Sequence, residues 1–453
     1  GAELELDLVD AAGRPSPINK QVLAEAADPR VTLEVDRFNL EINSSPVAAA
    51  GTPFSSLARE LDDSLGGLQA AAARYGSRVV AIGILPTLTE DDLQSSALTD
   101  GARYRALSSG IRRLRRTPFP LHITGLDSLT LLADDVAYEG ANTSFQVHLR
   151  VNPADFARLH SAAQIATAPV LAAACNSPIF FGRRLWDETR VALFRQAVDD
   201  RRGVANDDDD WRPARVSFGH GWVREGAHEL FAESVTLHEP LLPVVGPEDP
   251  LAVVAAGKVP DLAELRLHHG TVWRWNRAVY DPAGEGHLRI ELRALPAGPT
   301  VKDMIANAAF FIGLIHGLSR EVPRLLAGLT FGHARRNFYR AACKGLDAEL
   351  LWPDGRRGRL RALSARALIE DLLPTAARGL AIIGVEAAES TRWLDIVAQR
   401  AATGQTGARW QRQVFDAAAR LGNRDEASHE LLRAYLEASE GGRGRPVHEW
   451  SLP

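Results

Sequence analysis

Several short segments of the chain alternate between apolar and ionisable side chains, which is the two-residue period of a β-strand. The clearest such segment is residues 287–299 (HLRIELRALPAGP). At its start, His287, Arg289, Glu291 and Arg293 alternate with the apolar residues Leu288, Ile290 and Leu292. The pattern predicts a strand with an apolar face in the core and an ionisable face suited to a metal-bound phosphate or a carboxylate. The alternative is the salt-bridged outer face of a half-buried strand.

The first ten residues (GAELELDLVD) show the same alternation. They place Glu3, Glu5 and Asp7 on one face of a predicted strand and leucines on the other. Carboxylates in a row repel one another unless cations lie among them. This face is therefore either a cation site or a solvated edge strand.

Two more predicted strands carry candidate ligands. Residues 144–151 alternate and present His148 and Arg150 on the polar face, although a lone His is more often structural than a metal ligand. In residues 31–43, Glu34 and Glu41 are seven positions apart, so an unbroken strand would put them on opposite faces. A bulge or a loop between them would bring both to one site.

The spacing of apolar residues predicts helices elsewhere. Asn152 followed by Pro is a typical helix start, and Thr300 with Asp303 resembles a capping box. We also expect a helix over residues 55–75, a buried strand over 78–88, and several helices near the C-terminus with a break at Pro374. Strands therefore precede a helical C-terminal third, and the fold class is α+β.

The composition is that of an ordinary globular protein, with 45% apolar and 24% charged residues among 453. A formal net charge of -5 argues against a nucleic-acid-binding protein, which normally has a basic face. The sequence has no run of about 18 apolar residues and no basic leader, so we expect no membrane attachment and a cytoplasmic location.

Cys175 and Cys343 are too few for a disulfide framework. The acidic run at 207–210 is expected to be a solvated loop, and the missing initiator Met suggests residues before Gly1 in the native protein.

The predicted strands together carry one set of metal-ligand candidates, which are Glu3, Glu5, Glu34, Glu41, His148 and Glu291. Carboxylate oxygens with one imidazole suit Mg²⁺ or Mn²⁺, and phosphate can supply the remaining ligands. Arginines on the same strands, such as Arg150 and Arg289, suit anions, so the combination indicates phosphoryl transfer. Neither a Walker-A nor a Rossmann glycine pattern occurs, so side chains of the sheet would bind any nucleotide.

In their order and spacing these segments resemble the glutamate-cysteine ligases of the glutamine synthetase-like superfamily, in the carboxylate-amine ligase branch. The resemblance rests on GAELELDLVD, on Glu34 and Glu41 with LEINSSP, on VHLRV, on the NSP loop at 176–178 and on HLRIELRALP. It extends more loosely through residues 337–348 into the C-terminal helices and covers most of the chain. It implies a glutamine synthetase-like fold, in which a curved, mainly antiparallel sheet forms a funnel and helices pack outside it.

The resemblance also implies roles for individual residues. The metal-ligand candidates would hold the divalent ions that bridge ATP and the acceptor carboxylate. Arg293 matches the arginine that stabilises the transferring γ-phosphoryl group, so Arg293 and Glu291 are the implied catalytic residues, and Arg277, Arg289 and Arg150 would contact the nucleotide. The implied reaction is phosphorylation of a carboxylate by ATP, typically the γ-carboxylate of glutamate. An amine, typically that of cysteine, then attacks to give an amide, ADP and phosphate.

The sequence departs from the family pattern at two places. Gln146 stands where many relatives have a second His, and Cys175 and Asn176 replace the small hydroxyl residues common before Ser-Pro. These departures leave the amino-acid substrates open. Two other functions also remain open: a phosphagen-type guanidino kinase, which shares the superfamily core, and a non-catalytic nucleotide-binding regulatory protein.

We expect three regions along the chain. These are a ligase catalytic core over residues 1–345, a helical region packed on it over 346–440, and a tail over 441–453. The expected partners are small molecules, namely ATP, glutamate or a similar carboxylate, and an amine or amino acid. A homodimer is plausible for the family, and no stretch of the sequence demonstrates an interface.

Overall fold

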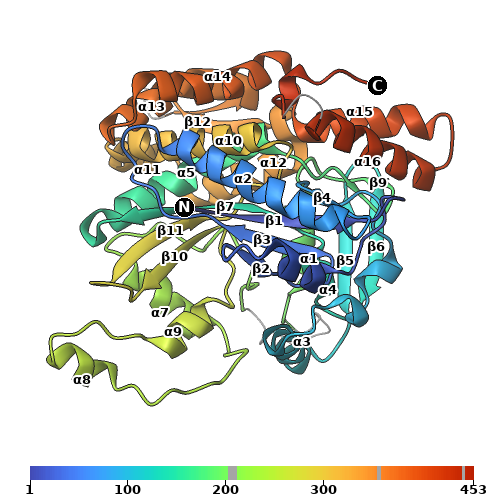
Figure 1. Cartoon of the computed structure of the whole chain (residues 1–453). Helices are drawn as coiled ribbons and strands as arrows, with labels where there is room; N and C mark the ends of the chain where they lie inside the picture. Colours follow the sequence, from blue (N-terminus) through green and yellow to red (C-terminus); the bar gives the residue numbers. More distant parts are fainter. Residues whose placement is uncertain (202–211, 355–358, 441–443) are drawn as a thin grey trace, which may run out of the picture.

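In the computed structural model, an antiparallel sheet lies at the centre of the molecule (Figure 1). The structure describes residues 1–201, 212–354, 359–440 and 444–453, and these contribute seven strands to the sheet. The acidic run at 207–210 lies outside the described residues. From one edge to the other the strands are β10 (Asn276–Asp281), β11 (His287–Leu292), β7 (Phe145–Val151), β1 (Ala2–Val9), β3 (Asn39–Asn43) and β2 (Val31–Leu33), with β4 (Arg78–Val80) paired to the second half of β1.

The alternation seen in the sequence is present in the sheet. Leu4, Leu6 and Leu8 of β1 are fully buried, as is Ile290 of β11, so the apolar face of each strand lies in the core. The strands expected near residues 1–10, 144–151 and 287–293 all form. The segment 31–43 is interrupted as expected, because β2 and β3 pair antiparallel as a hairpin with residues 34–38 between them.

Helices pack on the apolar side of the sheet (Figure 1). The long helix α10 contacts β7, α5 contacts β10 and α2 contacts β4, while α13 and α14 form an outer layer on α10. The described helices are α1 (Asn19–Ala26), α2 (Pro53–Ala73), α3 (Ala102–Arg115), α4 (Ala137–Gly140), α5 (Phe156–Ala174), α6 (Thr189–Ala197), α7 (His228–Leu237), α8 (Pro250–Ala255), α9 (Ala263–His269), α10 (Val301–Ser319), α11 (Val322–Gly328), α12 (Phe331–Lys344), α13 (Ala365–Ile382), α14 (Ala387–Thr403), α15 (Gly407–Ala419) and α16 (Arg424–Glu440).

Three two-stranded hairpins lie outside the main sheet within the described part of the chain. They are β5 (Phe119–Thr124) with β6 (Ser128–Ala133), β8 (Ile179–Phe180) with β9 (Arg183–Arg184), and β12 (Glu349–Pro353) with β13 (Leu360–Ser364). The last hairpin interrupts the region expected to be helical. The strand expected over residues 78–88 is shorter than predicted, because β4 pairs with only three residues of β1 and the buried residues after it continue without a partner strand.

The helix break expected at Pro374 does not occur, because α13 runs through it from Ala365 to Ile382. The expected cap at the start of α10 is present in part: the Thr300 hydroxyl accepts from the backbone N–H of Asp303 and donates to the Asp303 carboxylate. Helix α10 has the length and mean hydropathy (1.3) of a membrane span, but 78% of it is buried inside the protein. A buried core helix meets the same criteria, so α10 is weak evidence for a membrane span.

Helices α10 and α13 cross at a glycine contact that sets their spacing. A side-chain carbon on Gly379 would collide with the backbone oxygen of Gly313, and one on Gly313 would lie 2.7 Å from the oxygen of Ala376. Because neither backbone can move away without disturbing the core, we expect Gly379→Ala to lower the free energy of unfolding by about 1–3 kcal/mol. Urea denaturation measures the change.

The matched control is Gly67→Ala on the exposed face of α2, where an added carbon meets nothing within 4 Å. Alanine favours a helix interior over glycine, so this variant should be more stable than the wild type by about 0.5–1 kcal/mol. Equal stability of the Gly379→Ala variant and the wild type would contradict the close packing of α10 on α13.

Candidate active site

One face of the sheet carries ionisable side chains from five neighbouring strands. The register of the pairs places Glu5 opposite Glu41, and His148 opposite Glu291, which in turn lies opposite Arg277. Residues directly opposite in an antiparallel pair project to the same face, so these side chains share one surface. Alternation within each strand puts these side chains on the polar face, and the register of the pairs brings them close to one another.

Glu3, His148 and Glu291 form the tightest part of this face. Their ligand atoms all lie within 4.8 Å of one another. The Nε2 atom of His148 is 2.9 Å from Oε1 of Glu3 and 3.7 Å from Oε1 of Glu291, and the imidazole is only 10% exposed. Neither ring nitrogen has a hydrogen-bond partner with good geometry among the residues that the structure describes. A buried imidazole facing two carboxylates in this way suits a metal ligand.

Two arginines balance the charge of Glu291. Arg277 donates to both carboxylate oxygens, with 2.9 Å between its Nη2 and Oε1, and Nη1 of Arg293 lies 3.3 Å from Oε1. Burial raises the pKa of Glu291, but the charges of Arg277 and Arg293 outweigh it and hold the pKa well below its usual range. Burial likewise raises the pKa of Glu3, and His148 outweighs it to lower the pKa overall. Both carboxylates are therefore ionised at neutral pH.

Glu5 of β1, Glu41 of β3 and Glu34 in the turn before β3 are compensated less by positive charge. Burial, followed by the charge of Glu5, raises the pKa of Glu34 to about 8. Burial, followed by the charges of Glu34 and Glu3, raises the pKa of Glu41 well above its usual range. Burial also raises the pKa of Glu5, although Arg293 opposes the shift. This excess of hard oxygen donors over positive charge fits divalent cations such as Mg²⁺ or Mn²⁺.

The other two predicted arginines lie further along the same face. Arg289 is opposite Arg150 in the register and 3.4 Å from Asp281, and Arg150 is exposed. Both line a cavity of about 810 Å³ that also reaches Glu3 and His148. The structure therefore does not bring Arg150 or Arg289 into direct contact with the described carboxylates of the metal-ligand set.

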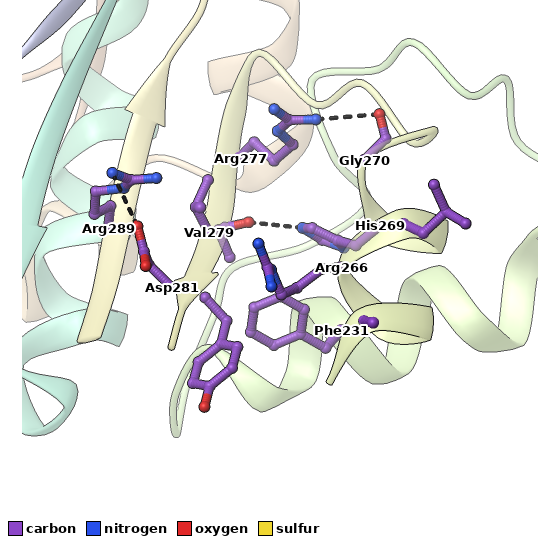
Figure 2. Close-up of a pocket in the computed structure, with 12 residues that line it drawn as sticks. Phe231, Arg266, His269, Gly270, Arg277, Val279, Asp281 and Arg289 are labelled. Carbon is purple, nitrogen blue, oxygen red and sulfur yellow. Dashed lines mark hydrogen bonds and ion pairs between the residues drawn. The ribbon is translucent and has the colours of Figure 1, made fainter. Parts of the chain in front are cut away.

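A second cavity, of about 440 Å³, lies between the edge strand β10 and helix α9 (Figure 2). Arg277 and Arg289 are among its lining residues. Figure 2 shows the ring of Phe231 facing this space from α7 and His269 reaching the backbone of β10, where its Nε2 is 2.8 Å from the carbonyl oxygen of Ala278. Asp281 and Arg289 line both cavities.

Sequence reasoning missed two residues of this site. Glu139 of α4 is half-buried, and burial with the charge of Glu5 raises its pKa to about 7. Arg190 of α6 is buried, pairs with Glu188 at 3.0 Å, and its charge opposes the rise in the pKa of Glu5. Neither residue lies in an alternating strand. The alternating pattern on which the sequence analysis relied therefore gave no signal for either residue.

The comparison with known families shows which family the chain belongs to. The model of glutamate-cysteine ligase family 2 matches residues 1–438. The chain belongs to this family. As a member of glutamate-cysteine ligase family 2 it is an ATP-dependent carboxylate-amine ligase, which confirms the resemblance seen in the sequence. No curated protein matches the sequence.

A solved structure with low sequence identity has the same fold. A glutamate-cysteine ligase from Francisella tularensis, solved in complex with AMP, is 12% identical, with a TM-score of 0.55 over 100% of this chain and 89% of that one. This member of the ligase family therefore has the mixed α/β fold with an antiparallel sheet found in that enzyme. The ligase PafA in its complex with the prokaryotic ubiquitin-like protein Pup is 10% identical, with a TM-score of 0.37 over 98% of this chain and 73% of that one.

Proposed function

We propose that the protein joins the γ-carboxylate of glutamate, or of a close analogue, to an amine such as that of cysteine, through an acyl phosphate and with Mg²⁺ or Mn²⁺. The observation that carries this proposal is the convergence of Glu3, His148 and Glu291 beside two arginines in a member of an ATP-dependent ligase family. Phosphorylating a carboxylate brings two anions together. A site with metal ligands and arginines side by side lowers that barrier.

The donor set divides into two groups. Glu3, His148 and Glu291 would hold one cation, and the remaining carboxylates, Glu5, Glu34 and Glu41, a second. Bound cations would neutralise the phosphates of ATP and polarise the transferring phosphoryl group. The protein residues hold the ligands in place through the register of β1, β3, β7 and β11.

The arginines are assigned to the anionic parts of the substrates. Arg293, half-buried and two residues from Glu291, would stabilise the γ-phosphoryl group during transfer. Arg277 and Arg289 line the cavity of Figure 2, which we assign to the nucleotide, with the ring of Phe231 available for stacking on the base. Arg150 and Arg289 line the larger cavity, where they would bind the carboxylates of the amino-acid substrates.

We extend the proposal to the architecture. The polar face of the sheet would be the lining of a glutamine synthetase-like funnel, with residues 1–345 as the catalytic core and 346–440 as a helical region packed on it. The contacts of α13 and α14 with α10 support this division. The two free cysteines support an expected location in the cytoplasm, where thiols stay reduced.

The test is turnover of the purified protein with Mg-ATP and a panel of carboxylates and amines. ADP, inorganic phosphate and product mass are measured in parallel, and equal amounts of ADP, phosphate and an amide are expected. A guanidino kinase would give a stable phosphorylated product without free phosphate. A regulatory protein would bind Mg-ATP and release no ADP. Either result overturns the proposed reaction.

Removal of divalent metal should abolish turnover and lower stability. Glu34 and Glu41 are repelled by neighbouring carboxylates, and a bound cation would relieve this repulsion. A cation that binds only the native state, at a free concentration 100 times its Kd, should raise the free energy of unfolding by about 2.7 kcal/mol. EDTA should therefore stop ADP release and lower the melting temperature of the substrate-free protein, and added Mg²⁺ should restore both. The His148→Ala variant should regain less stability on Mg²⁺ addition. Full activity in EDTA would contradict a metal-dependent reaction.

A further inference from the structure

A second group of acceptor oxygens lies further along the same face of the sheet as Glu5 and Glu41, where the side chains are fully buried. Asp7, Asp36 and Asn39 are each at most 2% exposed. Four of their side-chain oxygens are buried and accept no hydrogen bond from the described residues: Oδ2 of Asp7, both Oδ atoms of Asp36 and Oδ1 of Asn39. Buried acceptors without partners carry a large free-energy cost, so the structure calls for a partner at this point.

The three side chains come from different segments and converge on one place. Asn39 lies opposite Asp7 in the register of β1 and β3, and its Nδ2 donates to Oδ1 of Asp7 at 2.8 Å. Gly140 of α4 faces both Asp36 and Asn39. A side-chain carbon there would collide with Oδ2 of Asp36 and lie 3.1 Å from Oδ1 of Asn39. Glycine at residue 140 leaves room beside these oxygens.

The surroundings of this group are negative. The carboxylates of Glu139, Asp7, Asp135 and Glu34 all lie close enough to act on Asp36. A proton on one carboxylate would satisfy a single acceptor and leave the others unpaired. A cation contacts all of the oxygens at once and balances the charge.

We propose that Asp7, Asp36, Asn39 and the space beside Gly140 form a structural site for a divalent cation of the Mg²⁺, Mn²⁺ or Ca²⁺ class. Two carboxylates match the charge of a divalent ion, and a donor set made only of oxygens suits a hard cation. None of the three residues lines either of the two cavities assigned to the substrates. The ion therefore acts on the structure and does not contact ATP or the acceptor.

The positions of the ligands indicate what the ion does. Each lies two residues from a carboxylate of the active site: Asp7 from Glu5, Asp36 from Glu34 and Asn39 from Glu41. An ion at this point would fix the β2–β3 turn against β1 and so hold Glu34 and Glu41 at their places in the active site.

The site can be located directly in the wild-type protein. Crystals grown with Mn²⁺ and without nucleotide should give an anomalous difference peak among Asp7, Asp36 and Asn39, separate from any peak at Glu3, His148 and Glu291. A map with no peak among the first three residues overturns the proposal. The experiment does not depend on turnover, so failure of the ligase assignment and failure of this site are distinguished.

Counting bound ions gives an independent test. Electron paramagnetic resonance of free Mn²⁺ should show that Asp36→Asn binds one ion fewer per chain than the wild type. Asp135→Asn is the matched control, because Asp135 is also buried but already accepts from Ser108 and from the backbone N–H of Val136. It should keep the wild-type count. An unchanged count in folded Asp36→Asn would overturn the proposal.

A kinetic readout rests on the proposed function. If the buried ion positions Glu34 and Glu41, Asp36→Asn should raise the Mg²⁺ concentration for half-maximal turnover by about 10-fold, which is typical of residues that orient metal ligands. The maximal rate at saturating Mg²⁺ should change less. A lower maximal rate with an unchanged Mg²⁺ requirement would contradict the positioning role.

Discussion

Glu291→Gln should lower kcat for ADP release by about 10³-fold, which is the scale of losing one charged contact to a transition state. Glutamine keeps the shape of the side chain but removes the charge that Arg277 and Arg293 share. It also removes a ligand oxygen from the group formed with Glu3 and His148. Steady-state kinetics, normalised to the folded fraction from circular dichroism, measures the effect.

The folded fraction matters because Glu291 is buried. Leaving two arginines without their carboxylate should lower the free energy of unfolding by about 3–5 kcal/mol. Glu437→Gln is the matched control, because Glu437 forms an exposed ion pair with Arg433 on α16. It should leave both kcat and stability close to those of the wild type. If Glu291→Gln loses activity only in proportion to its unfolded fraction, Glu291 is a structural residue and not part of the catalytic site.

Arg293→Ala should lower kcat by about 10³-fold or more, because an arginine at a transferring phosphoryl group contributes 10³ to 10⁵ in the rate of such reactions. Binding of ATP should weaken much less, since the guanidinium acts on charge that develops during transfer. Presteady-state kinetics that separates ATP binding from phosphoryl transfer checks this division. If the variant binds ATP more weakly but transfers the phosphoryl group at a normal rate, Arg293 contributes to ATP binding and not to the transition state.

Arg433→Ala provides the control for loss of an arginine. Arg433 is exposed on α16 and pairs with Glu430 and Glu437, so its loss should leave the kinetics unchanged. Arg293→Lys adds a finer test, because lysine keeps the charge without the planar group that can donate two hydrogen bonds. It should recover part of the rate if charge is the main contribution of Arg293.

The central sheet and its polar face could be predicted from the sequence because both follow from local alternation. The side chains of β1, β7 and β11 alternate strictly, so Glu3, His148 and Glu291 had to project from their strands on the side opposite the leucines and valines. Glu34 and Glu41 are an odd number of residues apart, so they can share a face only if the strand is interrupted between them. The turn of the β2–β3 hairpin is such an interruption. The order of the strands in the sheet could not be predicted from the pattern, because alternation within a strand does not identify its neighbours.

The missed features depend on contacts between distant segments. Glu139 and Gly140 lie in a short helix without periodic pattern, and only the folded chain brings them to Glu5, Asp36 and Asn39. The uninterrupted course of α13 through Pro374 is another such case, because its close contact with α10 outweighs the local preference of proline.

The most direct measurement of the proposed reaction follows oxygen from the carboxylate. The carboxylate substrate that supports turnover is labelled with ¹⁸O, and the phosphate, nucleotide and amide products are analysed by mass spectrometry. Attack of the carboxylate on the γ-phosphoryl group of ATP, followed by the amine, should transfer one ¹⁸O to each phosphate released. Label found in AMP, or phosphate free of ¹⁸O with the label retained in the product, would contradict an acyl-phosphate ligase built on the carboxylate face of this sheet.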